Sequence, residues 1–286
     1  MNVAYLNGER VDNLNQISLY NPSFLYGINV FEGVRSYWNG FNQINFDLDE
    51  HLIRLYDSVS FIGFKFSISI ESLKREVLTI IEKEEFNCNI YIRLTLFLGD
   101  DSSWSDENNI YRLISFRKLD SSLDNLDPIS LSITSIKRIS SSAMPPFVKA
   151  GGNYLNSRYA LLEAKNKGFG GALFSSDKNY ISESTGSCVF FIKNSKVYTP
   201  SKECDILVGI TRNRIIDLCK NNGIEVEELL MPITSVYLYD AAFLAGTMIE
   251  LKPVSRIDRK NFNTTDNSLF LKIVKLFKEY VYKKEI

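Results

Sequence analysis

The sequence predicts an α+β fold in two domains, and three observations support this. Stretches with the period of a strand and stretches with the period of a helix are interspersed without a regular β-α-β repeat, which favours α+β over a doubly wound sheet. The 286 residues exceed the usual length of one domain. A turn-rich stretch, KLDSSLDNLD, precedes Pro128 near the middle of the chain. We therefore expect a first domain over residues 1–120, a linker over 121–132 and a second domain over 133–286.

Two strands and two helices are expected in the first domain. The stretches Val3–Leu6 and Asn89–Phe97 have the composition of strands. Between them, Glu50–Ile62 predicts a helix that Gly63 is placed to end, because its apolar residues share one face: Leu52, Leu55, Tyr56, Val59 and Ile62. A second helix is expected over Leu73–Glu82.

The second domain begins with a strand. Residues 129–134 alternate between aliphatic and hydroxyl side chains, which is the pattern of a half-buried strand. Helices are predicted over Asn153–Lys167 and from Thr211 onward, each followed by a glycine, with several short strands between them. A last helix is expected over Leu269–Val281, where apolar residues return at helical spacing.

Composition excludes several classes of protein. The net charge of −1 gives no field that would attract nucleic acid or an anionic membrane, and no apolar stretch is long enough to span a bilayer. His51 is the only histidine, so a multi-histidine metal site is excluded and we expect no metal. The four cysteines form no C-x-x-C pair, and the N-terminus does not resemble a signal peptide. We expect a cytoplasmic protein.

Four short motifs could carry chemistry, although each has an ordinary structural explanation. Lys149 precedes two glycines and a helix start in KAGGNY, yet an isolated loop lysine is usually solvated. The helix start at Gly209–Thr211 offers N–H groups and a hydroxyl that could hold a phosphate. Thr247 follows a glycine near a strand end, and Glu183 alone would be interpreted as a surface carboxylate.

The order of these motifs points to one family. The chain contains YGINVFEGVRSY, EHLIRLYDS and YIRLTLFLGD, then VKAGGNYLNSRYALLEAKNKG, YISESTGSCVFF, YTPSKECDILVGITRNRII and FLAGTMIELKPV. Together they resemble the fold-type IV pyridoxal 5'-phosphate (PLP) enzymes: branched-chain aminotransferases, D-amino-acid aminotransferases and aminodeoxychorismate lyases. The resemblance runs from about Val3 to Ile257. It implies a small α/β domain, a larger domain with a barrel-like sheet, PLP between them, and a homodimer.

The resemblance assigns three catalytic roles. It implies that Lys149 carries PLP as a Schiff base and moves the proton between the substrate Cα and C4′. Tyr154, in the matching K-x-x-x-N-Y, would donate to the phenolic oxygen of PLP. Glu183 would face the pyridine nitrogen, since a carboxylate there keeps the ring protonated and improves it as an electron sink.

The resemblance also assigns binding roles. The phosphate cup would consist of Arg54, Gly209, Ile210, Thr211 and Thr247. Tyr26, Phe31 and Gly33 match positions that line the side-chain pocket. Tyr91 and Arg93 match positions that recognise carboxylates, and Arg93 would accept the distal carboxylate of glutamate or 2-oxoglutarate. Met248 is expected to narrow or reshape the substrate site.

Two departures leave the substrate open. Cys188 replaces the asparagine that the family usually has five places after the glutamate, and Met248 replaces a small residue. Because K-A-G-G-N-Y with Y-I-R favours the branched-chain subgroup, the expected function is transfer of an amino group from a branched-chain or other hydrophobic L-amino acid to a 2-oxo acid. A D-amino-acid aminotransferase, an aminodeoxychorismate lyase and a non-catalytic relative are the alternatives.

Overall fold

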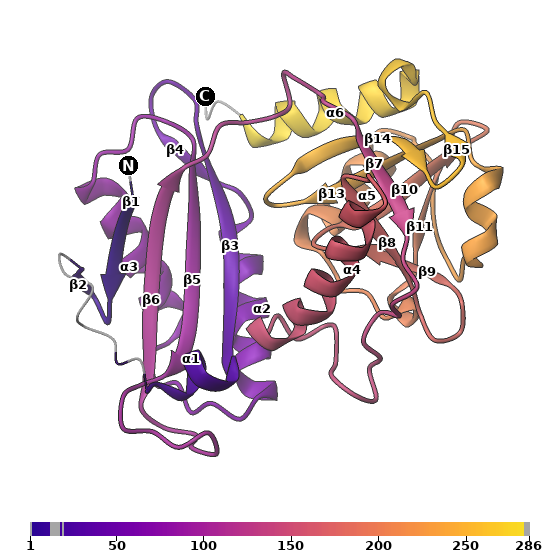
Figure 1. Cartoon of the computed structure of the whole chain (residues 1–286). Coiled ribbons are helices and arrows are strands. Elements are labelled where there is room, and N and C mark those ends of the chain that lie inside the picture. Colours follow the sequence, from indigo (N-terminus) through magenta and orange to yellow (C-terminus); the bar gives the residue numbers. More distant parts are fainter. Residues whose placement is uncertain (1, 12–17, 19, 283–286) are drawn as a thin grey trace. The chain divides into compact units, whose positions relative to one another are not determined.

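The computed structural model describes residues 2–11, 18 and 20–282 (Figure 1). It has the expected α+β composition and divides into two compact units, each with its own sheet. The first unit contains the described residues up to Asp120, the short segment Val148–Gly152, and Val281 with Tyr282; the second contains Ser121–Phe147 and Asn153–Tyr280.

The first unit is a six-stranded antiparallel sheet with the strand order β2-β1-β6-β5-β3-β4. Its elements are β1 (Asn2–Leu6), β2 (Glu9–Arg10), α1 (Pro22–Tyr26), β3 (Asn29–Trp38), β4 (Gln43–Asn45), α2 (Leu48–Phe61), α3 (Ile70–Lys83), β5 (Ile90–Leu98) and β6 (Ile110–Lys118). Helices α2 and α3 cover one face of this sheet (Figure 1). The sheet therefore has a helix-covered face and an opposite face.

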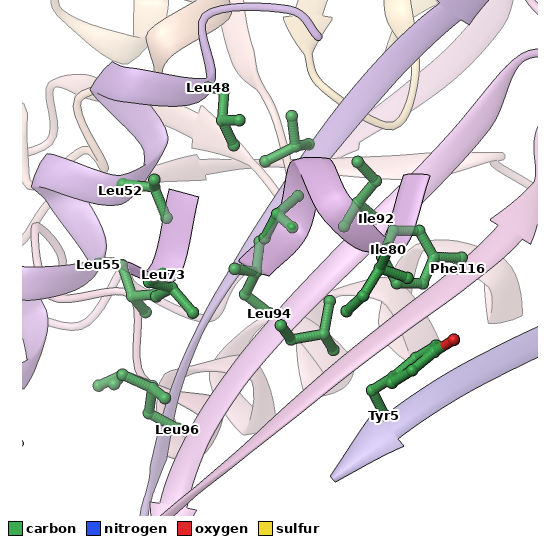
Figure 2. Packing of buried hydrophobic residues seen from close by; sticks show 14 of the residues in the cluster. Tyr5, Leu48, Leu52, Leu55, Leu73, Ile80, Ile92, Leu94, Leu96 and Phe116 are labelled. Carbon is green, nitrogen blue, oxygen red and sulfur yellow. The ribbon is translucent and has the colours of Figure 1, made fainter. Parts of the chain in front are cut away.

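Apolar packing between those helices and the sheet forms the core of the first unit. Figure 2 shows Leu52 and Leu55 of α2 and Leu73 of α3 facing the strands that carry Ile92 and Leu94. All five side chains are buried to at least 99%, so each contributes roughly 1.5–3 kcal/mol of hydrophobic stabilisation relative to an exposed position. This packing fixes which face of β3 and β5 turns toward α2.

The second unit contains a nine-stranded sheet with the order β12-β11-β10-β13-β14-β7-β8-β9, to which β15 adds by pairing with β14. Its strands are β7 (Ile129–Ile133), β8 (Gly171–Ser175), β9 (Ile181–Ser184), β10 (Cys188–Lys193), β11 (Lys196–Pro200), β12 (Val226–Leu229), β13 (Ala241–Gly246), β14 (Glu250–Ile257) and β15 (Lys260–Asn261). The helices are α4 (Tyr154–Asn166), α5 (Ile210–Asn221) and α6 (Ser268–Val281), with short 3₁₀ turns η2 (Gly151–Asn153), η3 (Lys202–Cys204), η4 (Ile233–Leu238) and η5 (Thr264–Asp266).

Aromatic and small residues hold this second unit together. The rings of Phe190 and Phe243 stack on neighbouring strands with centroids 4.9 Å apart. Helix α4 packs on β8 because Ala160 and Ala164 allow close approach to Phe174. The loops at the ends of β9, β10 and β13 therefore extend from strands of a packed sheet.

The units differ from the expected domain boundaries in two places. Residues 129–132 belong to β7, so the second sheet begins inside the expected linker. Lys149 lies in a segment of the first unit, not in a continuous second domain over 133–286. The reason is main-chain pairing: Val30 and Ala150 form an antiparallel bridge, and the Phe31 N–H donates to the Lys149 carbonyl over 3.0 Å.

Candidate active site

Four of the expected substrate residues lie on one face of the first sheet. In β3 and β5 the even-numbered residues turn toward α2 and α3, so the odd-numbered ones share the opposite face. Gly33 pairs directly with Arg93, and a Cβ on Gly33 would lie 2.1 Å from the Tyr91 hydroxyl oxygen. Only glycine fits beneath that hydroxyl. The Arg93 guanidinium lies 3.7 Å from the centre of the Phe31 ring.

Lys149 is tied to the same strand. Its N–H donates to the Ser58 hydroxyl over 3.1 Å, while its carbonyl accepts from Phe31. Its ammonium nitrogen lies 5.0 Å from the centre of the Phe31 ring. The lysine amine and the Arg93 guanidinium therefore both contact one aromatic ring, and a ligand bound there would meet an amine, a cation and an apolar surface together.

Arg54 belongs to a buried polar cluster on the helix-covered face. Glu32 Oε1 accepts a hydrogen bond from Arg54 Nε over 2.6 Å. Glu32 Oε2 accepts from Arg54 Nη2 over 2.9 Å and lies 2.7 Å from His51 Nδ1. Burial raises the pKa of Glu32, but Arg54 and His51 outweigh it and hold that pKa well below its ordinary range. Burial lowers the pKa of His51. The cluster is thus an ionised glutamate between an arginine and a neutral histidine.

Sequence reasoning missed Glu32 and assigned His51 no role. The available signal was the position of Glu32 between Val30 and Val34, which places a carboxylate on the inward face of a strand. That signal required β3 to be recognised as a strand.

Glu183 lies on β9 in the second unit, and it is 95% buried. Its Oε1 forms an ion pair with Arg138 Nη2 at 2.9 Å and accepts from the Leu207 N–H over 3.3 Å. Arg138 is in turn held by the Asn156 side chain and by its own N–H, which donates to the Ser175 carbonyl. Glu183 is therefore not a surface carboxylate, and Arg138 is a partner that sequence reasoning did not identify.

The start of α5 is arranged as an anion site. The Thr211 hydroxyl is buried and has no hydrogen-bond partner among the described residues. Gly209 is the N-cap of α5, so the first amides of the helix lack helical acceptors. The helix dipole adds positive potential at this end. A phosphate bound here would accept hydrogen bonds from this hydroxyl and from the first N–H groups of the helix.

Cys188 has a structural role next to this helix start. It is buried on β10, and its thiol donates to the Leu207 carbonyl over 3.5 Å. A Cβ on Gly209 would lie 2.9 Å from the Cys188 sulfur, which requires the glycine. The 207–209 loop thus contacts both Glu183 and Cys188 before it enters α5.

The remaining expected residues lie on other elements. Tyr154 begins α4 and Thr247 lies in the turn between β13 and β14. A Cβ on Gly246 would lie 3.2 Å from the Ser187 Cβ, so this turn passes close to the residue before Cys188. Met248 and Tyr26 are 42% and 64% exposed.

Comparison with known proteins identifies the family. The model of the amino-transferase class IV family matches residues 29–257. The chain belongs to the class IV aminotransferases. A probable branched-chain-amino-acid aminotransferase of Aquifex aeolicus is 34% identical over 254 residues, which cover 86% of this chain and 80% of that protein.

Solved structures of class IV aminotransferases have the same fold over nearly the whole chain. A branched-chain aminotransferase from Thermoproteus uzoniensis, solved with norvaline, superposes with a TM-score of 0.92 at 29% identity, covering 99% of this chain and 95% of that one. A Thermobaculum terrenum enzyme in its PLP form gives a TM-score of 0.91 at 28% identity, covering 98% and 94%. The expected family, fold class and PLP-dependent aminotransferase chemistry are therefore confirmed. Within the described ranges, no helix of this aminotransferase is long and apolar enough to cross a membrane.

Proposed function

We propose that this aminotransferase transfers the amino group of a branched-chain or other hydrophobic L-amino acid to a 2-oxo acid such as 2-oxoglutarate. The observation that carries the proposal is the contact of Lys149 and Arg93 with the same Phe31 ring. That arrangement places an amine, an apolar surface and a carboxylate-binding group together, which are what such a pair of substrates requires.

The start of α5 in the second unit fits the phosphate of PLP. The buried Thr211 hydroxyl and the start of α5 provide donors for a phosphate, and Gly209 allows the backbone to approach it. Arg54 and Thr247 are proposed to complete the phosphate contacts, with the amide of Ile210. When bound, PLP supplies the aldehyde that accepts the amino group and a ring that takes up electrons as a proton leaves the substrate.

Lys149 is proposed to attach the cofactor and to move the proton at the substrate Cα. Its main chain is fixed on both sides by Ser58 and Phe31, so that only the side chain needs to move during this transfer. Tyr154 is proposed to donate to the phenolic oxygen of the cofactor, and its place at the start of α4 gives its backbone a fixed position.

Glu183 is proposed to accept a hydrogen bond from the protonated nitrogen of the cofactor ring. Arg138 supports this role because it orients the carboxylate through Oε1 and compensates the charge in a buried setting. Asn156 holds Arg138 in the same unit, so the carboxylate has a fixed direction.

The substrate side chain is proposed to lie against Phe31 and over Gly33, near the Tyr91 hydroxyl. Arg93 stacks on Phe31 in this structure. When the substrate is 2-oxoglutarate, Arg93 would accept its distal carboxylate; when the substrate is hydrophobic, the stacked position covers the guanidinium with an aromatic face. Met248 and Tyr26 are each proposed to contribute to substrate binding.

The test is an absorbance titration of the purified protein with PLP, followed by L-leucine, L-glutamate and D-alanine in separate samples. We expect a cofactor band that changes with L-leucine and L-glutamate and returns when 2-oxoglutarate is added. A change with D-alanine alone would favour the D-amino-acid enzyme. A protein that binds PLP but responds to no amino acid would overturn the transaminase, and one that binds no PLP would favour the non-catalytic relative.

We also propose that the enzyme is a cytoplasmic homodimer. Support for the dimer comes from apolar side chains that this single chain leaves exposed on two helices: Phe24, Leu25 and Tyr26 of α1, and Leu155, Tyr159 and Leu162 of α4. The last three are spaced four and three residues apart and so share one helical face. Light scattering of the purified protein gives the mass directly, and a monomer mass would contradict the dimer.

A further inference from the structure

We propose that Glu32 and His51 are positioning residues that orient Arg54 for a phosphate group. This inference rests on the proposed function, since it takes Arg54 as one of the residues that bind the phosphate of PLP. It begins from the setting of Glu32, which is fully buried on β3 between Val30 and Val34. An ionised carboxylate without partners in such a setting is strongly destabilising, so Glu32 requires partners that compensate its charge.

Glu32 forms hydrogen bonds with the side edge of the Arg54 guanidinium. The two carboxylate oxygens accept from Nε and Nη2, which form the side edge of the guanidinium, at 2.6 and 2.9 Å. Two parallel bonds fix the plane as well as the position of the guanidinium. Because Glu32 uses the side edge, the end edge formed by Nη1 and Nη2 is the one proposed to contact a phosphate. The side chain of Arg54 is 15% exposed, whereas that of Glu32 is wholly covered, so the arginine reaches outward from the core.

His51 fixes the carboxylate in turn. An ionised carboxylate can only accept, and the lowered pKa of His51 keeps the ring neutral, so Nδ1 carries the proton that is donated to Glu32 Oε2 over 2.7 Å. The other ring nitrogen, Nε2, is buried without a hydrogen-bond partner in the part of the chain that the structure describes. Among the described residues, the hydrogen bond that the structure shows for this ring is therefore the one to Glu32.

The alternative to positioning is charge compensation, and the two make opposite predictions. If Glu32 merely neutralises Arg54, removing its charge strengthens the attraction between Arg54 and an anion. If Glu32 orients Arg54, removing the carboxylate weakens anion binding despite the gain in positive charge. Replacement of Glu32 by glutamine distinguishes them, because the amide keeps the size of the side chain but can accept from only one of the two arginine nitrogens.

The experiment compares pyridoxal 5'-phosphate with pyridoxal, which lacks the phosphate. Dissociation constants are measured for both on the apo-protein by absorbance or fluorescence titration, in the wild type and in Glu32→Gln. The dissociation constant for pyridoxal divided by that for pyridoxal 5'-phosphate measures the contribution of the phosphate to binding. Positioning predicts that this ratio falls about tenfold, the effect of one charge-assisted hydrogen bond, while the constant for pyridoxal stays within about twofold.

His51 provides the matched pair of variants. Asparagine at this position can place an amide N–H where Nδ1–H lies, whereas phenylalanine keeps the ring shape without a donor. We expect His51→Asn to keep most of the phosphate preference and His51→Phe to lose it. This pair also decides the question if Glu32→Gln does not fold, since each variant leaves the carboxylate and Arg54 in place.

The outcomes separate this inference from the proposed function. A wild-type protein that binds neither compound would overturn the proposed function. A wild type that prefers the phosphate compound, with the same or a greater preference in Glu32→Gln and in His51→Phe, would leave the proposed function intact and refute the positioning role.

Discussion

Substitution of Gly209 by alanine is expected to destabilise the protein, because the added Cβ would lie too close to a neighbouring side chain. In Gly209→Ala the new Cβ would lie 2.9 Å from the Cys188 sulfur and 3.4 Å from the Arg212 Cβ. Atoms in apolar contact normally stay about 3.5–4.0 Å apart. The backbone at Gly209 has φ −72° and ψ 134°, which alanine adopts without strain. The whole cost is therefore steric.

The magnitude depends on whether Cys188 can move. Its strand pairs with β13, and its thiol donates to the Leu207 carbonyl, so the sulfur is held on two sides. Overpacking of a fixed site costs about 1–3 kcal/mol. We expect Gly209→Ala to lower the thermal midpoint of the apo-protein and to weaken PLP binding, since the start of α5 must shift to relieve the contact.

The assay is a double-mutant cycle with Cys188→Ala, which removes the sulfur that the new carbon would meet. Thermal midpoints and PLP dissociation constants are measured for the wild type, both single variants and the double variant. Relief of the steric contact predicts that the double variant is more stable than additivity allows, by about 1–2 kcal/mol. Purely additive losses would show that Cys188 is not what requires a glycine at position 209.

Four further predictions follow from other parts of the molecule. Lys149→Ala should abolish transamination, measured as 2-oxo acid release, and normal turnover would exclude Lys149 as the cofactor lysine. Glu183→Ala should still bind PLP but lose about 10- to 100-fold in rate, the worth of one charge-assisted hydrogen bond; an unchanged kcat would remove its role. Because the folded-state pKa of Glu32 is depressed, its stabilisation is present above its unfolded pKa and is lost as pH falls. Wild-type thermal midpoints should thus fall more steeply than those of Glu32→Gln between about pH 5 and pH 3, and parallel curves would contradict this. Leu52→Ala should destabilise the first unit by about 2–5 kcal/mol in denaturant unfolding, and a loss below about 1 kcal/mol would show that this position can collapse.

The helices other than α1 could be predicted from the sequence because their signals are local. The apolar positions of α2 recur at helical spacing, and Gly63 ends the helix in the left-handed conformation that glycine adopts readily, with φ 79°. The start of α5 at Gly209–Thr211 was predicted for the same reason. In each case the residues that determine the structure are neighbours in the chain.

The long strand β3 was not predicted because it is buried on both faces. Eight of its ten residues are buried, so the alternation of apolar and polar side chains that identifies a half-buried strand is absent. Without β3, the inward direction of Glu32 could not be inferred. Its contacts with His51 and Arg54 depend on which face of the strand α2 covers.

Contacts between distant residues were also beyond sequence reasoning. The bridge between Val30 and Ala150 brings Lys149 to the first sheet, and nothing in the KAGGNY motif indicates this pairing. The ion pair between Arg138 and Glu183 joins a loop to β9 in the same way. The family resemblance supplied the identity of Lys149 and Glu183, whereas their supporting residues appear only once the chain is folded.

Lys149 is proposed to attach PLP, and chemical trapping of the bound cofactor tests this role. The protein is incubated with PLP, reduced with borohydride and digested, and the peptides are examined by mass spectrometry. We expect a phosphopyridoxyl group on the peptide that contains Lys149 and no label in a Lys149→Ala control. Label on a different lysine in the wild type, or no label after PLP has visibly bound, would contradict it.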